Sequence, residues 1–162
     1  MFTLEDIRNI ALQIEKNGEE TYRRAARSCH DEDTARLLTA LADDEKRHRQ
    51  WLRALPAGRP LSAEEREMEK MGRELLREMM ASNPFVPDSD ELAASDFIDV
   101  LRRSRDFEED TIVFYRFLLA LLDDREAVAG MEAIIAEEGR HQRQLETLLL
   151  QHHDNIAAGQ SC

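Results

Sequence analysis

The chain has 162 residues and a formal net charge of −12 at pH 7, with 34 acidic and 22 basic residues. A surface this acidic repels phosphate backbones, so we expect no nucleic-acid partner, whereas cations would be attracted. No apolar run approaches the roughly 20 residues that a membrane helix needs, and the first residues show no secretory signal, so no membrane association is expected. Neither Cys29 nor Cys162 belongs to a CxxC pair, which favours a reducing, cytoplasmic location.

Apolar residues recur with helical spacing along two pairs of segments. In the first pair, covering about 4–55, one helix is expected at about 4–29 and the next ends near Pro56, because proline stops a helix. The second pair covers about 97–152 and turns at the sequence "DDRE". The tail 154–162 is expected to fray.

A long connection, about 56–96, separates the two pairs. The breaks "PAGRP" and "NPFVPDSD" flank an expected helix at about 63–82, which begins with a capping box made by Ser62 and Glu65. Short connections join antiparallel helices, and a long one is typical of a crossover. The sequence therefore predicts an all-α, single-domain four-helix bundle, in which two hairpins are joined by a crossover that carries an extra helix.

The two hairpins repeat one another. An offset of 93 residues (45 to 138 and 48 to 141) places "DDEKRH" on "AEEGRH" without a gap. The same offset aligns further residues of the two hairpins: Glu15 with Glu108, Tyr22 with Tyr115, and Arg47 with Arg140. The Glu-x-x-His motif therefore occurs twice because the hairpin occurs twice.

This repeat predicts a metal site. Residues three apart share a helix face, and the faces of the two motifs are otherwise apolar. Burying them would bring together four carboxylates and two imidazoles, which we interpret as metal ligands: Glu15, Glu45, His48, Glu108, Glu138 and His141. Burying a carboxylate without a partner would cost several kcal/mol of folding free energy. Two divalent cations would balance four carboxylates, and these oxygen and nitrogen ligands suit two iron ions, with manganese and zinc as alternatives.

The alternative interpretation is a duplicated bundle whose acidic residues are solvated partners of Lys and Arg. Glu19, Glu20 and Glu109 fit that description. We also expect His30 and the pair at 152–153 to be solvated.

Six further residues are candidates for supporting the ligands. The tyrosines could donate hydroxyl hydrogen bonds to ligand carboxylates across the bundle, or could simply be core aromatics. Acids beside the motifs could hold the outer nitrogen of a ligand histidine, with arginines bracing those acids, or could form ordinary surface ion pairs. These candidates are Tyr22, Tyr115, Asp44, Glu137, Arg47 and Arg140.

At these motifs the chain resembles the ferritin-like superfamily, especially its rubrerythrin-like branch, over about 4–55 and 97–150. "DEKRH" and "EEGRH" also resemble the (D/E)ExRH signature of larger di-iron oxygenases. The resemblance implies that Glu45 and Glu138 bridge two metals. It implies that Glu15 and Glu108 are terminal ligands, and that each histidine binds one metal.

Two departures from rubrerythrin bear on activity. The chain lacks the two CxxC pairs of a rubredoxin-type iron site, so peroxidase turnover would need an external electron donor. Rubrerythrin has an extra carboxylate three residues after the third-helix ligand, where this chain has Thr111 and, at the matching position, Gly18.

We interpret the chain as an oxidoreductase that oxidises Fe(II) with dioxygen or peroxide, as a ferroxidase or peroxide scavenger. The alternative is a non-catalytic metal-storage or metal-carrier protein with a structural dinuclear site, and an oxygenase component is a weaker third option. We expect a homo-oligomer, with a dimer favoured and the middle helix as its contact.

Overall fold

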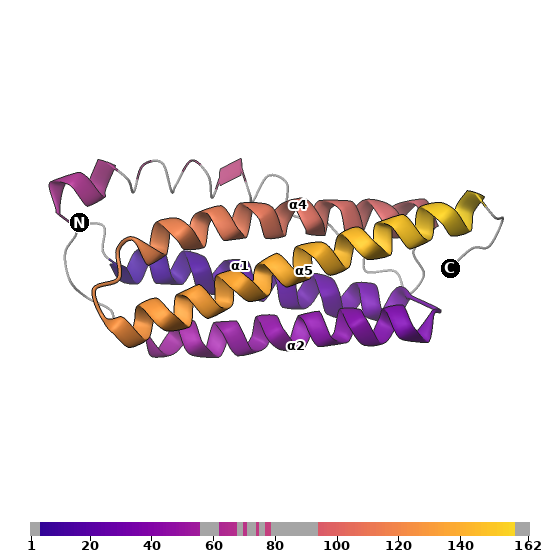
Figure 1. Ribbon diagram of the computed structural model, residues 1–162, viewed down its shortest axis with the longest axis horizontal. Coiled ribbons are helices and arrows are strands. Elements are labelled where there is room, and N and C mark those ends of the chain that lie inside the picture. The colour runs from indigo at the N-terminus through magenta and orange to yellow at the C-terminus, as the bar shows by residue number, and fades with distance from the viewer. Residues whose placement is uncertain are drawn as a thin grey trace.

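The computed structural model describes residues 4–55, 62–67, 70, 74, 77–78 and 94–157, with the backbone alone at 94–96 and 153–157. Four long helices form an antiparallel bundle: α1 (Leu4–Ser28), α2 (Glu32–Ala54), α4 (Ala94–Leu119) and α5 (Arg125–Ala157). They pair as the hairpins α1/α2 and α4/α5 (Figure 1). No strand occurs in these ranges, so the expectation of an all-α four-helix bundle is confirmed.

Local signals fix the helix ends. The Asp31 side chain caps α2 by accepting a hydrogen bond from the Thr34 amide at 2.8 Å. The helix stops before Leu55, which takes an extended conformation (φ −60°, ψ 135°), as the residue before a proline prefers. Asp124 caps α5 in the same way, since its Oδ1 accepts from the amide of Glu126 at 3.0 Å.

Two details of the expected elements can be compared with the structure. The capping box is present, because Ser62 Oγ accepts from the Glu65 amide at 3.2 Å and Glu65 Oε2 accepts from the Ser62 amide at 2.6 Å. Helix α5 continues to Ala157, four residues into the segment expected to fray. The rest of the predicted middle helix, 68–82, lies largely outside the described residues, as do 158–162.

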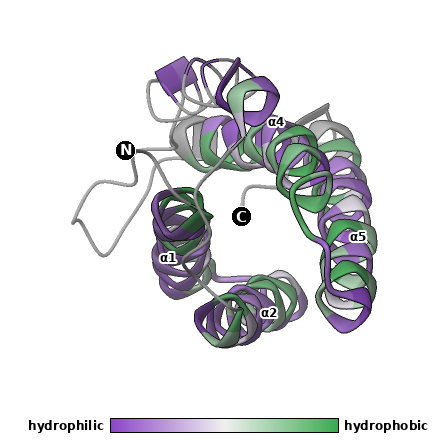
Figure 2. Cartoon of the chain, turned by 90° about the vertical axis from the view of Figure 1, so that its left-hand side faces the viewer, coloured by the Kyte–Doolittle hydropathy of each residue, from purple (hydrophilic) through white to green (hydrophobic). Residues whose placement is uncertain are grey.

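The core consists of two apolar clusters at opposite ends of the bundle. One is built around Ile14, Phe114 and Met131, and the other around Leu41, Leu101 and Leu145. Seen along the bundle, the four helices surround a common centre, and each carries both hydrophobic and hydrophilic residues (Figure 2). On α1, α2 and α5 the buried Glu and His residues of the predicted site fall between residues of the two clusters, and on α4 Glu108 directly follows Phe107, a member of the first cluster.

The two hairpins also make direct contact. The indole of Trp51, on α2, occupies the space that a side chain at Gly130, on α5, would need. Trp51 therefore packs one hairpin against the other. Glycine at 130 permits this close approach because it has no Cβ.

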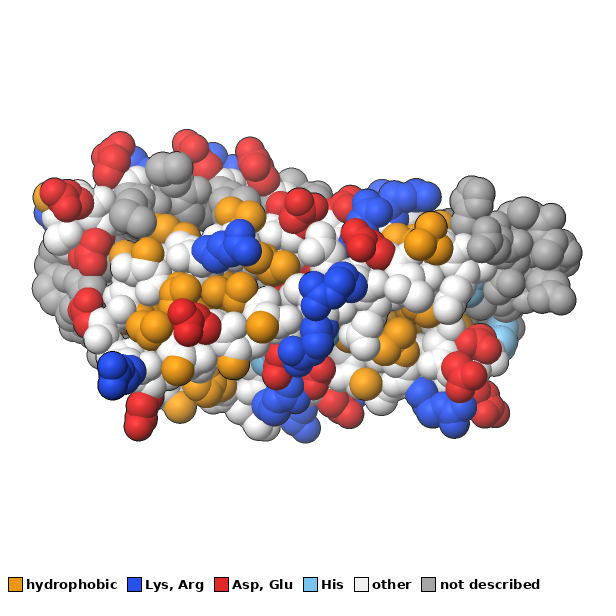
Figure 3. Space-filling view, in the orientation of Figure 1, with side chains coloured by type: hydrophobic (Ala, Val, Ile, Leu, Met, Phe, Trp, Pro, Cys, Tyr) orange, Lys and Arg blue, Asp and Glu red, His pale blue; other side chains and the backbone are white. Residues whose placement is uncertain are grey.

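Basic and acidic groups are mixed on the face of the molecule where α5 lies (Figure 3). The face on which α5 lies shows apolar groups interrupted by a band of Lys or Arg and Asp or Glu side chains (Figure 3). None of the helices in the described part of the chain is long and apolar enough to cross a bilayer.

One expectation about the surface is wrong. His152, expected in solvent, is only 7% exposed, and its ring packs edge-on against Phe97 with the centroids 5.5 Å apart. The helical face of α5 that carries the site extends to this residue, so the imidazole is buried against α4. Glu19 is also more enclosed than expected, since its side chain is 13% exposed and is paired with Arg23 and Arg49.

Candidate metal centre

All six predicted ligands lie in the polar layer between the two apolar clusters. Each helix contributes from its inward face, and none of these residues is more than 3% exposed. They form two overlapping groups of donor atoms, in each of which the atoms lie within 4.8 Å of one another. One group is Glu15, Glu45, His48 and Glu138, and the other is Glu45, Glu108, Glu138 and His141.

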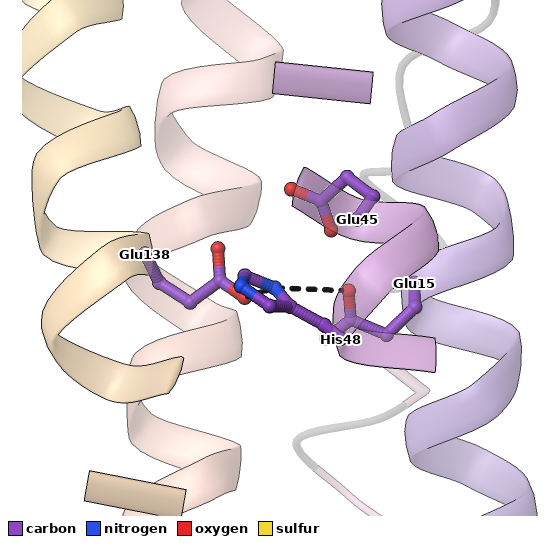
Figure 4. Close-up of side chains that lie close together, drawn as sticks. All are labelled: Glu15, Glu45, His48 and Glu138. Carbon is purple, nitrogen blue, oxygen red and sulfur yellow. Dashed lines mark ion pairs between the residues drawn. The ribbon is translucent and has the colours of Figure 1, made fainter. Parts of the chain in front are cut away.

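Glu45 and Glu138 belong to both groups, whereas each of the other four residues belongs to one. Glu138 lies between the two imidazoles: its Oε1 is 3.0 Å from His48 Nδ1, and its Oε2 is 3.0 Å from His141 Nδ1. His48 Nδ1 also lies 3.4 Å from Glu15 Oε2 (Figure 4). Glu138 thus has the geometry of a carboxylate that is shared by the two groups of donor atoms.

The inward atoms are close to one another but are not hydrogen bonded. Among the predicted ligands, six buried atoms have no hydrogen-bond partner: Glu15 Oε2, Glu45 Oε1, both carboxylate oxygens of Glu138, His48 Nδ1 and His141 Nδ1. Buried polar atoms without partners are rare and costly in folded proteins. Their convergence from three helices, α1, α2 and α5, fits bound cations, which would supply the missing partner for every one of them.

The histidines are held in the orientation that a metal requires. His48 Nε2 contacts Glu137 Oε2 at 2.7 Å, and His141 Nε2 contacts Asp44 Oδ2 at 3.1 Å. An ionised carboxylate can only accept a hydrogen bond, so each Nε2 carries the proton. In the neutral imidazole that binds a cation, Nδ1 would then direct its lone pair into the site.

These acids hold the histidine of the opposite hairpin. Glu137, on α5, binds the imidazole of α2, and Asp44, on α2, binds the imidazole of α5. Arg47 donates to both acids, to Asp44 Oδ1 at 2.6 Å and to Glu137, while Arg140 lies 3.3 Å from Glu137. The sequence suggested these groups but not which acid would hold which histidine.

The tyrosines also cross the bundle. The Tyr22 hydroxyl donates to Glu108 Oε1, and the Tyr115 hydroxyl donates to Glu15 Oε1. Both tyrosines are buried, with exposures of 2% and 0%. Each therefore fixes one oxygen of a carboxylate that belongs to a single group, and for Glu15 the other oxygen, Oε2, faces His48 Nδ1.

The carboxylates differ in electrostatic environment. For Glu138, burial would raise the pKa, but the two histidines outweigh burial and lower the pKa to about 2. Burial, followed by the charges of Glu138 and Glu15, raises the pKa of Glu45 well above its ordinary value. Burial and the charge of Glu138 raise the pKa of Glu108 to about 7. Near neutral pH the metal-free site therefore contains protonated carboxyl groups.

The histidines also hold protons when no cation is bound. Burial alone would lower the pKa of His48, but the carboxylates of Glu138 and Glu15 raise it to about 11. The pKa of His141 is raised in the same way by Glu108, Glu138 and Glu45. Cations entering the site would replace these protons.

Metal uptake is therefore expected to release protons and to weaken as the pH falls from 8 to 6. Glu108, with its pKa of about 7, becomes protonated over this range, and each proton displaced lowers the apparent affinity about tenfold per pH unit. Titration with the redox-inert ions Mn(II) or Zn(II) at pH 6, 7 and 8 would measure this dependence, and an indicator dye in weak buffer would count the protons. An affinity that does not change with pH would contradict it.

Comparisons with known proteins agree with this fold. Residues 2–56 match the Rubrerythrin family model. No curated protein matches the chain significantly. A hypothetical protein from Pyrococcus furiosus has a similar structure, with a TM-score of 0.69 and 22% identity, over 94% of this chain and 92% of that one.

A second solved structure, from Thermotoga maritima, bears a name that describes a ferritin-like diiron-carboxylate protein. Its TM-score is 0.64 at 22% identity, over 91% of this chain and 95% of that one. At this identity the likeness establishes the fold, while the family match covers the first hairpin. The chain therefore shares the fold of these two structures, its first hairpin matches the Rubrerythrin family model, and its cluster of carboxylates and histidines is consistent with a dinuclear metal site.

Proposed function

We propose that this protein is a di-iron carboxylate protein that oxidises Fe(II) with peroxide or dioxygen, in iron homeostasis or defence against oxidants. The observation that carries the proposal is the set of six buried donor atoms that converge without hydrogen-bond partners. The name of the Thermotoga maritima protein, which includes diiron, supports the choice of iron.

In this proposal Glu45 and Glu138 are ligands to both ions. Glu15 and His48 complete one position, and Glu108 and His141 complete the other, as the two groups of donor atoms suggest. Fe(II) is the reductant: two ions each lose one electron to one hydrogen peroxide, whose O–O bond breaks, and with two protons the products are two Fe(III) and two waters. Dioxygen, the other oxidant, accepts four electrons, so its full reduction to water needs four Fe(II).

The chain's own groups bind, orient and exclude water. Tyr22 and Tyr115 hold the carboxylates of Glu108 and Glu15, so that these cannot turn away from the site. Glu137 and Asp44 fix the imidazoles. The apolar clusters above and below the polar layer keep bulk water out, which strengthens the attraction between the carboxylates and cations.

The test is oxidation of Fe(II) by the loaded protein. Anaerobic metal-free protein would receive two Fe(II) per chain, and Fe(II) loss would be followed after adding peroxide or, separately, air. We expect oxidation well above the rate in buffer, lost in Glu15→Ala and retained in the control Glu20→Ala, which alters an exposed acid of the same helix. Stable binding with no oxidation above the buffer rate would instead favour a metal-storage or metal-carrier protein.

Three further properties belong to this proposal. Repeated peroxide reduction would draw electrons from an external donor, because the 162 residues contain no CxxC pair. A dimer in the reducing cytoplasm, with the segment 63–82 at the contact, is the assembly we propose. The mass of the assembly in solution would distinguish a dimer from a storage cage, which needs many subunits to enclose a cavity.

A further inference from the structure

Gly18 lies in the site although it has no side chain to contribute. It is buried on α1, one turn after Glu15 and on the same face. A Cβ at this position would lie 3.1 Å from Glu45 Oε2, 3.2 Å from its Cδ and 3.3 Å from its Cγ. The Glu45 carboxylate therefore rests against the α1 backbone, in space that only glycine leaves.

Glycine is a poor choice for the interior of a helix, because it loses more conformational freedom on folding than alanine does. The backbone of α1 is regular at this position, so the helix itself does not require glycine. The contact with Glu45 supplies the physical reason for it.

The repeat provides an internal comparison. Thr111 occupies on α4 the position that Gly18 occupies on α1, and its side chain is 2% exposed and donates to the Phe107 carbonyl at 2.8 Å. The equivalent space in the second hairpin is thus filled. The two halves of the site differ at this position, although all six predicted ligands match.

The two shared carboxylates differ accordingly. Glu138 places its two oxygens at 3.0 Å from the two imidazoles. Glu45 places Oε1 at 3.1 Å from His141 Nδ1, while its Oε2 is the atom nearest to Gly18. Glu138 is held symmetrically between the histidines, whereas Glu45 is directed partly into the space left by the missing side chain of Gly18.

We propose that Gly18 is a positioning residue for Glu45, and that it makes Glu45 the shared ligand with room to move while Glu138 stays fixed. This inference rests on the proposed dinuclear site. A carboxylate that can enter and leave this space would be able to turn between contacting one ion and contacting two. Filling the gap would push Glu45 toward the ions and remove that freedom.

The test compares two glycines of the same bundle. Gly18→Ala introduces the contact with Glu45, whereas at Gly139 a Cβ would meet only Arg143 Nη1, at an ordinary 3.5 Å. We expect Gly139→Ala to bind two Mn(II) or Zn(II) with wild-type affinity and to melt about 2–4 °C higher, because alanine is the better helix former. We expect Gly18→Ala to keep its helical content and to bind the pair of ions at least tenfold more weakly in competition with a chelator.

Shortening Glu45 separates positioning from a general packing effect. Glu45→Asp should weaken binding in the wild-type background, but in the Gly18→Ala background it should cost less or restore affinity, because the shorter side chain no longer meets the added methyl group. Such coupling supports the proposal, and strictly additive losses would overturn it. If Gly18→Ala alone fails to fold, recovery of folding in the double variant supports the same contact, and failure of both overturns it.

The inference and the proposed function fail in different ways. A wild-type chain that binds no pair of ions would refute the proposed dinuclear site, and the positioning role with it. A wild-type chain that binds two ions, with unchanged affinity in Gly18→Ala, would refute only the role of Gly18.

Discussion

Replacing Glu138 by alanine is expected to abolish the binding of two metal ions per chain. Glu138 is the residue whose two oxygens face both imidazoles at 3.0 Å, and both groups of donor atoms include it. Without it, each position loses a ligand, and the bridge between them is gone. Glu45→Ala, which removes the other shared carboxylate, should have the same effect.

Variants of the unshared ligands should behave differently. Glu15→Ala and Glu108→Ala each remove a ligand from one position, so each should still bind one ion. Metal analysis after gel filtration would give the stoichiometry, and Glu132→Ala, at an exposed position of the same helix, is the control for Glu138→Ala. If Glu45→Ala or Glu138→Ala still takes up two ions per chain, the assignment of shared ligands is wrong.

Metal loading is expected to raise the melting temperature by more than about 10 °C. Each ion present at about 100 times its dissociation constant contributes about 2.7 kcal/mol to the free energy of unfolding, and 1 kcal/mol shifts the melting temperature of a domain of this size by about 2–4 °C. Two ions therefore give a shift of this order. The physical origin is the set of buried donors that have no partner in the metal-free protein.

Melting followed by circular dichroism, with a chelator or with excess Mn(II), would measure this shift. Glu138→Ala serves as the comparison, because it should melt at nearly the same temperature in both solutions. Equal melting temperatures for wild-type protein with and without metal would show that metal binding does not stabilise the buried cluster.

The sequence predicted the fold and the clustering of the six residues because both depend on periodicity. Helical spacing placed Glu45 beside His48 on one face, and the offset of 93 residues carried that argument to Glu138 and His141. The capping box at Ser62 could be predicted because it depends on residues close in the chain.

Other features depend on how the hairpins are set against one another, and spacing does not reveal that. The sequence indicated that Asp44 or Glu137 could hold a histidine. Which acid pairs with which histidine depends on how α2 and α5 are positioned relative to one another along the bundle axis. The prediction that His152 lies in solvent was wrong because its burial depends on contact with Phe97 on another helix. The role of Gly18 was missed because the signal is an absent side chain, although the mismatch with Thr111 in the repeat could have revealed it.

The contacts that orient the predicted ligands run between hairpins rather than within them. Four contacts do so: Tyr22 to Glu108, Tyr115 to Glu15, His48 to Glu137, and His141 to Asp44. If the two hairpins are exchanged, each of these contacts becomes another contact of the same set. A homodimer of one hairpin would have this twofold symmetry. One hairpin therefore carries half a site, which a second copy of the same hairpin would complete.

Joining the halves in one chain removes a constraint on how the site can evolve. In a homodimer of identical hairpins, every substitution appears on both sides of the twofold axis. In a fused chain, one half can change while the other is kept. Gly18 and Thr111 are such a divergence. The predicted ligands are the same in both hairpins, but these two residues make the two sides of the site unequal.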